Sequence, residues 1–134
     1  MKVIPPQPMD FQLFAVPVSF NPAAVPPISF PAGSTVEVTS RMALIVFYLN
    51  PLPAGVIAGF SATPIDWLDS GGRPISRPAC FQVVASSPDR VALLDINVAS
   101  ADAPFHLALN LTYNGQTYSS PDPTVLNKED PIGL

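Results

Sequence analysis

The sequence predicts an all-β protein, a single-domain antiparallel β-sandwich of immunoglobulin-like type, on three observations. Turn signals recur about every 8–12 residues and separate short segments of β-forming residues, which suggests seven or eight strands. The 18 prolines among 134 residues leave no long helix, because each interior proline costs a helix about 3 kcal/mol. A hairpin signal, Asn114-Gly115, lies near the C-terminal end. A jelly roll would fit the same spacing and stays open.

The hairpin carries the strongest local pattern. From Phe105 to Tyr113 every second residue is large and apolar, which predicts a strand with one buried face. Asn114-Gly115 favours a type I′ turn, in which both central residues need positive φ. Gln116–Tyr118 would then form the returning strand.

The other expected strands follow from period-two or continuously apolar segments bounded by turn residues. Pro17 marks the edge or the end of the first strand, because proline cannot donate to a ladder. Met42–Leu49 is apolar throughout, which predicts a central strand covered on both faces. Asp95 would accept hydrogen bonds at a sheet edge or face solvent. The expected strands are 11–18, 35–39, 42–49, 56–60 and 64–68 (one interrupted strand or two), 81–85, 90–98 and 124–126.

The expected organisation is one domain over residues 1–134. Residues 1–32 hold eight prolines and would form a proline-rich N-terminal strand or arm. Residues 33–127 would form the sandwich core, and 128–134 a tail.

Charge and hydropathy exclude several function classes. The net charge is −4, and the six basic residues form no cluster, so nucleic-acid binding lacks its electrostatic source. The longest apolar segment has eight residues, far short of the roughly 20 that span a bilayer. One lysine and no apolar stretch before Pro5 give no secretion signal. We therefore expect a cytoplasmic protein without membrane insertion.

The sequence offers no catalytic set, and we predict that the protein is not an enzyme. His106 is the one candidate base, and no nucleophile motif accompanies it. Cys80 is a lone cysteine, expected to be a buried and inert thiol. We therefore expect no cofactor and no transition metal. Calcium in a loop stays open, with two candidate groups: Asp66 with Asp69, and Asp122 with Asn127, Glu129 and Asp130.

Aromatic rings give a second functional hypothesis. A β-sandwich that binds sugars uses exposed rings as stacking platforms, and the candidate ligand-binding residues are Trp67 and Tyr118. Trp67 lies between apolar neighbours, so a core position is the alternative for that residue.

The C-terminal third resembles a known family. Phe105 to Asn127 combines the alternating strand, Asn114-Gly115, Tyr118 and Asp122-Pro123-Thr124-Val125-Leu126-Asn127. This segment is similar to the DP-EP family of small uncharacterised bacterial proteins. Where the family label expects Glu-Pro, the chain has Glu129-Asp130-Pro131. The resemblance implies a bacterial origin and no established activity.

We therefore predict a non-enzymatic structural or protein–protein interaction module. It would act through its sheet edges and the proline-rich arm, because its few charges leave the edges without the usual lysine protection. Its partner would be a protein, including a second copy in a homo-oligomer. The alternatives are a small-ligand or carbohydrate-binding sandwich, and a structural subunit of a phage or secretion apparatus.

Overall fold

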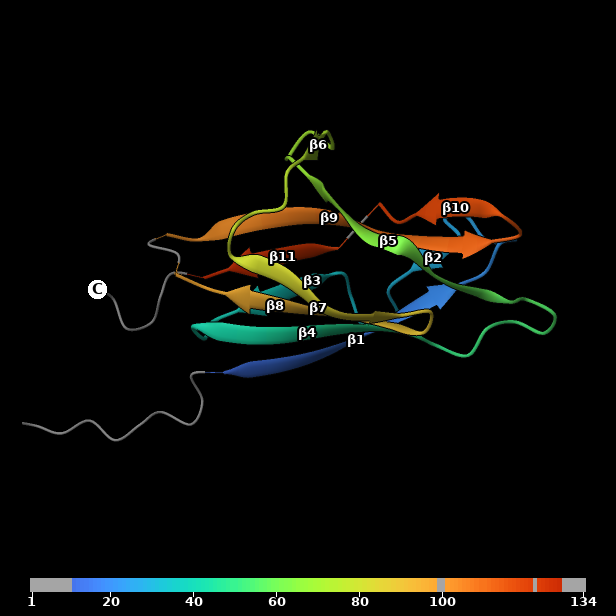
Figure 1. Cartoon of the computed structure of the whole chain (residues 1–134), viewed down its shortest axis with the longest axis horizontal. Helices are drawn as coiled ribbons and strands as arrows, with labels where there is room; N and C mark the ends of the chain where they lie inside the picture. The colour runs from blue at the N-terminus through green and yellow to red at the C-terminus, as the bar shows by residue number, and fades with distance from the viewer. Residues whose placement is uncertain (1–10, 99–100, 122, 129–134) are drawn as a thin grey trace, which may run out of the picture.

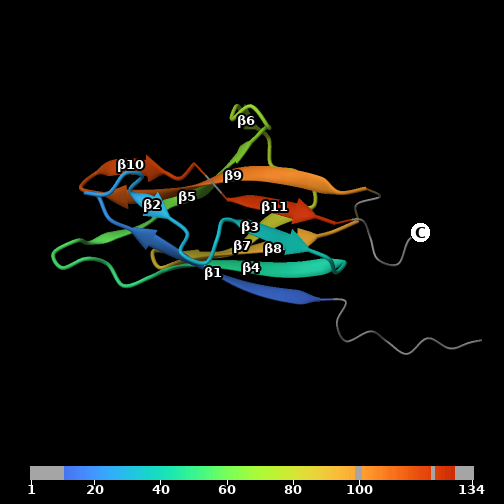
Figure 2. The same ribbon diagram turned by 180° about the vertical axis from the view of Figure 1, so that it is seen from behind.

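The computed structural model describes residues 11–98, 101–121 and 123–128, which form two β-sheets packed face to face. Figure 1 shows the two layers one above the other, and Figure 2 shows them from behind. No helix occurs in these residues, and the sheets do not close into a barrel. The buried apolar side chains of both layers form one cluster. The expected all-β sandwich is confirmed.

The first sheet has five strands, most of which lie in the lower layer of Figure 1. In chain order these are β1 (Gln12–Phe20), β2 (Ile28–Ser29), β4 (Met42–Leu49), β7 (Phe81–Ser87) and β8 (Arg90–Ile96). In space the order is β2-β1-β4-β8-β7. Every second side chain is buried between the sheets in β4 from Ala43 to Phe47, in β8 from Val91 to Asp95, and in β1 from Val16 to Phe20.

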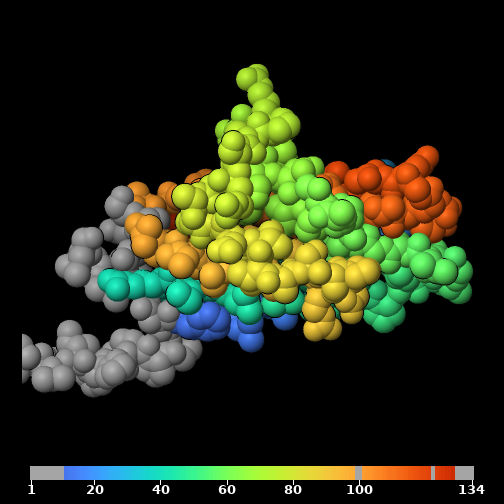
Figure 3. All heavy atoms as spheres, in the orientation of Figure 1, coloured from blue at the N-terminus to red at the C-terminus, as the bar shows by residue number. Residues whose placement is uncertain are grey.

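The second sheet has six strands. They are β3 (Thr35–Val38), β5 (Ala58–Leu68), β6 (Pro74–Ile75), β9 (Ala103–Tyr113), β10 (Gln116–Ser119) and β11 (Thr124–Asn127). The order is β3-β11-β9-β5-β6, and β10 also pairs with β9. β5 is a single strand, so one interrupted strand, and not two, occupies the segment expected over 56–68. Its pairing register with β9 shifts between Phe60 and Ile65. Figure 3 shows β6 and its turn projecting from the body of the molecule.

The described residues contain eleven strands, more than the seven or eight expected. Two-residue strands such as β2 and β6 are too short to show a period of two. Two strand pairs also run parallel, β1 with β4 and β3 with β11, so the sheets are mixed and not purely antiparallel. The alternation of side chains is the same in both orientations, so the sequence pattern cannot distinguish them.

The N-terminal proline-rich segment belongs to the sandwich. β1 pairs with β4 over seven residues and buries Val16, Val18 and Phe20 in the core. The expected division between an arm (1–32) and a core (33–127) is therefore not seen in the described residues. Residues 1–10, and residues 129–134 of the expected tail, lie outside them.

The C-terminal hairpin forms as predicted. Asn114 and Gly115 have φ values of 50° and 72°, as a type I′ turn requires. Leu107, Leu109 and Leu111 are at most 1% exposed and face the core.

Gly59 of β5 marks a close approach between the two layers. A Cβ at this position would lie 2.9 Å from Pro88 Cβ and 3.0 Å from the Pro88 carbonyl oxygen, in the turn between β7 and β8. The neighbouring amide of Phe60 donates to that carbonyl at 2.8 Å, so the backbones cannot separate freely. We expect Gly59→Ala to lower the free energy of unfolding by about 1–3 kcal/mol. Urea denaturation would measure this change, and an unchanged midpoint would contradict it.

Candidate functional site

The molecule has an open seam along one side, where one edge strand of each sheet lies beside the other. Over Gln12–Val18, β1 pairs with β4 on one side and with no described strand on the other. Among the described residues β3 likewise pairs with β11 alone. Figure 2 shows β1, β2 and β3 on this side of the molecule.

The backbone groups of β1 that face the seam can be identified from its neighbours. The carbonyl of Val18 accepts from Asn50 N on the β4 side at 2.9 Å, whereas Asn21 N donates to Pro27 O on the β2 side. Alternate residues of a strand direct their backbone groups to opposite edges, so Leu13, Ala15 and Pro17 present theirs to the open edge. Pro17 has no N–H, as expected for a proline at a strand edge.

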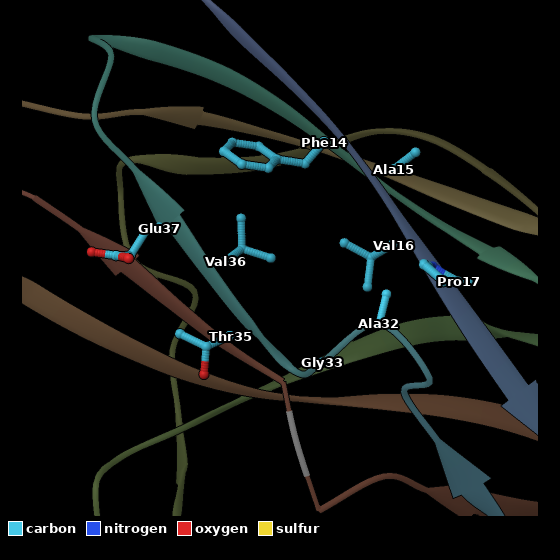
Figure 4. Close-up of a pocket in the computed structure, with 9 residues that line it drawn as sticks. All are labelled: Phe14, Ala15, Val16, Pro17, Ala32, Gly33, Thr35, Val36 and Glu37. Carbon is cyan, nitrogen blue, oxygen red and sulfur yellow. The ribbon is translucent and has the colours of Figure 1, made fainter.

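A groove of about 260 Å³ lies between the two edges, and we call it the β1–β3 groove. In Figure 4, Phe14 and Val16 from β1 and Val36 from β3 point toward one another across it. Val16 and Val36 belong to the hydrophobic core, so the floor of the groove is the core itself. The complete lining is Phe14, Ala15, Val16, Pro17, Ala32, Gly33, Thr35, Val36 and Glu37.

Both ends of the seam are closed by specific contacts. At one end Gln12 Oε1 accepts hydrogen bonds from Thr39 N (2.7 Å), Ser40 N (3.0 Å) and Ser40 Oγ (3.0 Å). At the other end β2 pairs with Ser19 and Phe20. The open length in between, from residue 13 to residue 17, is about 13 Å at 3.3 Å per residue.

The outer face of the first sheet is a second notable surface. Met42–Leu49 is central, as predicted, but the described chain covers only its inner face. The expectation that it is covered on both faces is therefore wrong for the described residues. Apart from Arg90, the outward side chains of β4 and its two neighbours are apolar, and they stand outside the core cluster. This outer face consists of Leu13, Ala15, Pro17, Met42, Leu44, Val46, Tyr48, Gln82, Ala85, Ser87, Arg90, Ala92, Leu94 and Ile96.

A buried polar group ties the two sheets together at the end of the core. Asp95 of β8 is 0% exposed, and Asn127 Nδ2 of β11 donates to its Oδ1 at 3.0 Å. Asn97 Nδ2 donates to the carbonyls of Val38 (3.2 Å) and Lys128 (3.0 Å). The expectation that Asp95 lies at an edge or faces solvent is wrong, because β8 is paired on both sides and Asp95 points inward.

Asp95 and Cys80 have raised pKa values. Burial raises the pKa of Asp95 to about 6, against a weaker opposite effect of the Asn127 hydrogen bond. Burial, and then the negative charge of Asp95, raise the pKa of Cys80 to about 11. A thiol with so high a pKa is protonated at neutral pH and is a poor nucleophile. The structure therefore agrees with an inert cysteine, although Cys80 is only half-buried.

The two candidate sugar-stacking residues do not form a common site. Trp67 is 7% exposed and packs against Phe81 in the core, with ring centroids 4.7 Å apart, so it offers no open ring face. Tyr118 is half-buried against Phe20 and Tyr113. Their partners on β9 are Leu107 and Leu111, four residues or about 13 Å apart.

The remaining chemical candidates are dispersed. His106 is half-buried, and its Nδ1 lies 3.3 Å from Thr124 Oγ1. Of the calcium candidates, Asp69 accepts from the amides of Gly71 and Arg73 in its own turn, and Asn127 is engaged by Asp95. Asp122, Glu129 and Asp130 lie outside the described residues. In the part of the chain that the structure describes, no three His, Cys, Asp or Glu side chains are placed to hold a metal ion.

Comparison with known proteins does not assign the chain to a family. No protein-family model matches the chain, and no curated protein matches it. The similarity of residues 105–127 to the DP-EP family stays a prediction. Within the described residues, no helix has the length and hydropathy of a membrane span.

The sequence pattern pointed to sheet edges as a class but not to this groove. Pro17, a proline suited to a strand edge, is the one local feature of the sequence that indicates the groove. Recognising the groove also needs the parallel pairing of β1 with β4, which places β1 at an edge beside β3.

Proposed function

We propose that this immunoglobulin-like sandwich is a non-enzymatic protein-interaction module that binds an extended segment of a partner protein in the β1–β3 groove. The partner segment would add a strand to the edge of β1. Strand addition of this kind obtains affinity from main-chain hydrogen bonds and specificity from pockets for alternate side chains.

The observation that carries the proposal is an unpaired strand edge beside an apolar groove. Leu13 and Ala15 offer N–H and C=O groups, and Pro17 offers a C=O group. A strand in antiparallel or parallel register could use all of these. Phe14, Val16 and Val36 would meet every second side chain of that strand. The preferred partner segment is therefore about five residues long, apolar at alternate positions and without proline at the paired positions.

The size of the groove favours a peptide over a small molecule. Pockets for small ligands usually measure about 300–1,000 Å³ and enclose most of the ligand. The groove is smaller, at about 260 Å³, and lies along an open edge. The burial of Trp67 removes one of the two rings on which the sugar-binding alternative depends.

A display library of random decapeptides tests the proposal with a defined probe. We expect enriched sequences to alternate apolar and polar residues. An enriched peptide, synthesised and bound to the full chain, should slow amide exchange at Leu13 and Ala15. Failure to enrich any sequence, or protection confined to other strands, would contradict the proposal.

Ala32→Trp and Ala54→Trp form a matched pair for the same assay. Each alanine is exposed in a turn and precedes a glycine with positive φ, Gly33 or Gly55, but only Ala32 lines the groove. We expect Ala32→Trp to weaken binding of the enriched peptide at least about tenfold by filling the groove. Ala54→Trp should leave its affinity unchanged. Equal effects of both substitutions would contradict binding in the groove.

A further inference from the structure

We infer that the outer face of the first sheet binds a second copy of this chain in a two-fold symmetric, face-to-face dimer. This inference concerns the outer face, which shares only Ala15 and Pro17 with the lining of the β1–β3 groove, and it does not rest on the proposed function. Figure 1 shows the face on the lower side of the molecule, where β1 and β4 lie.

The face is a regular grid of apolar rows, because the strand registers align its outward side chains. One row across three strands is Leu13, Leu44 and Leu94. The next row, two residues along each strand, is Ala15, Val46 and Ala92. Large and small rows therefore lie side by side, about 6.6 Å apart.

This alternation of large and small rows is self-complementary. A two-fold axis between the rows would seat the leucine row of each copy on the Ala15-Val46-Ala92 row of the other, with Leu13 and Leu94 over alanines and Leu44 over Val46. Interdigitation of large on small side chains is how facing layers of a core pack without voids. A two-fold contact uses the same patch on both subunits, so one self-complementary patch is sufficient. The two sheets would stack about 10 Å apart, as in a β-sandwich.

The distribution of charge on the outer face is also compatible with the binding of a second copy of the chain. Arg90 is the one charged side chain on the face, and it lies in the end row. The Asp89 carboxylate borders the end row, with its Oδ2 3.9 Å from Arg90 Nη2, but the rows of Leu44 and Val46 carry no acidic residue, so two copies that each carry a net charge of −4 can meet at the centre of the face without facing carboxylates.

The area of the face indicates how tightly two copies would bind each other. Four strands about 4.8 Å apart and seven residues long span about 440 Å² of sheet. Such an area is comparable with the largest apolar patch of a typical monomer, which is often functional. Two copies together would bury about 900 Å² measured in the sheet plane, which is below the roughly 1,200 Å² at which stable specific interfaces begin and in the range of weak, transient contacts. We therefore expect a weak dimer that dissociates on dilution.

Sedimentation equilibrium of the full chain, over a wide range of protein concentration, tests the inference. We expect the mass to rise from monomer to dimer with concentration. Leu44→Glu places a carboxylate at the centre of the face and should raise the dissociation constant at least about tenfold. Ile57→Glu makes the same kind of change at an exposed residue outside the face (89% exposed) and should dimerise as the wild type does.

Two further variants keep the test decisive. Leu13→Glu changes a side chain that is 68% exposed at the rim of the face, so it should weaken the dimer without affecting folding. Ala32→Trp fills the β1–β3 groove and should dimerise normally, which separates this inference from the proposed function. A wild-type protein that stays monomeric at the highest concentration would overturn the inference. So would a dimer that Leu44→Glu and Leu13→Glu leave unchanged, or that Ile57→Glu weakens equally.

Discussion

A chain that begins at residue 33 is expected not to fold. It would lack β1 and β2, which place Val16, Val18, Phe20 and Ile28 in the core. Burial of such side chains stabilises a fold by about 1.5–3 kcal/mol each, so the loss is about 6–12 kcal/mol. The total stability of a domain is about 5–15 kcal/mol, so this loss would remove most or all of it.

Near-ultraviolet circular dichroism and thermal unfolding would measure this effect. A chain that begins at residue 11 is the control, because it keeps every contact that the described residues make with β1 and should unfold cooperatively. A cooperative transition in the 33–134 chain would show that β1 is dispensable, contrary to its position between β2 and β4.

Replacement of Asp95 by Asn is expected to raise stability at neutral pH. The pKa of Asp95 is about 6 in the folded protein, above its ordinary value of 3.8, so the folded state holds the proton more tightly than the unfolded state. Its favourable contribution is therefore fully present below pH 3.8 and is lost as the pH rises through about 6. The difference between the two pKa values corresponds to about 3 kcal/mol.

The hydrogen bonds explain why Asn should be tolerated at position 95. Asp95 Oδ2 and Asn127 Oδ1 are buried and have no partner among the described residues. Both are acceptors while Asp95 is ionised. Protonation of Oδ2, or an amide group in its place, supplies the donor that could join them. The Asn127–Asp95 contact would then gain a second hydrogen bond.

Urea denaturation of wild type and Asp95→Asn between pH 3.5 and 8 would test this prediction. We expect the variant to be similar to the wild type at the acid end and more stable by up to about 3 kcal/mol above pH 6. Other carboxyl groups titrate in both proteins, so their effects cancel in the difference. A difference that does not change with pH would contradict a buried, proton-linked Asp95.

Much of the fold could be predicted from local pattern. The period of two predicts β1, β3, β8 and β9, the continuous apolar segment predicts β4, and Asn114-Gly115 predicts the hairpin, because these signals depend on residues near one another in sequence. Pairing across long separations leaves no such signal. The sequence therefore did not show that β1 runs parallel to β4, or that β3 lies beside the last strand.

The candidate sites show the same limit. The alternation from Arg90 to Ile96 placed Asp95 on the same side as Val91 and Leu93, but its polarity suggested an exposed position. The compensating partner, Asn127, lies 32 residues away on the other sheet. Likewise, the continuously apolar segment Met42–Leu49 predicts two covering layers, whereas the described chain supplies one.

The parallel pairing of β3 with β11 has a consequence for synthesis on the ribosome. β3 is completed at residue 38, but its one strand partner among the described residues, β11, ends at residue 127. The second sheet therefore cannot be completed until residue 127 has been translated. Such distant pairings are slow to form. Until then a nascent chain would expose apolar segments. We therefore expect chaperone binding to raise the yield of folded protein in cells, and to have little effect on the stability of the protein once it has folded.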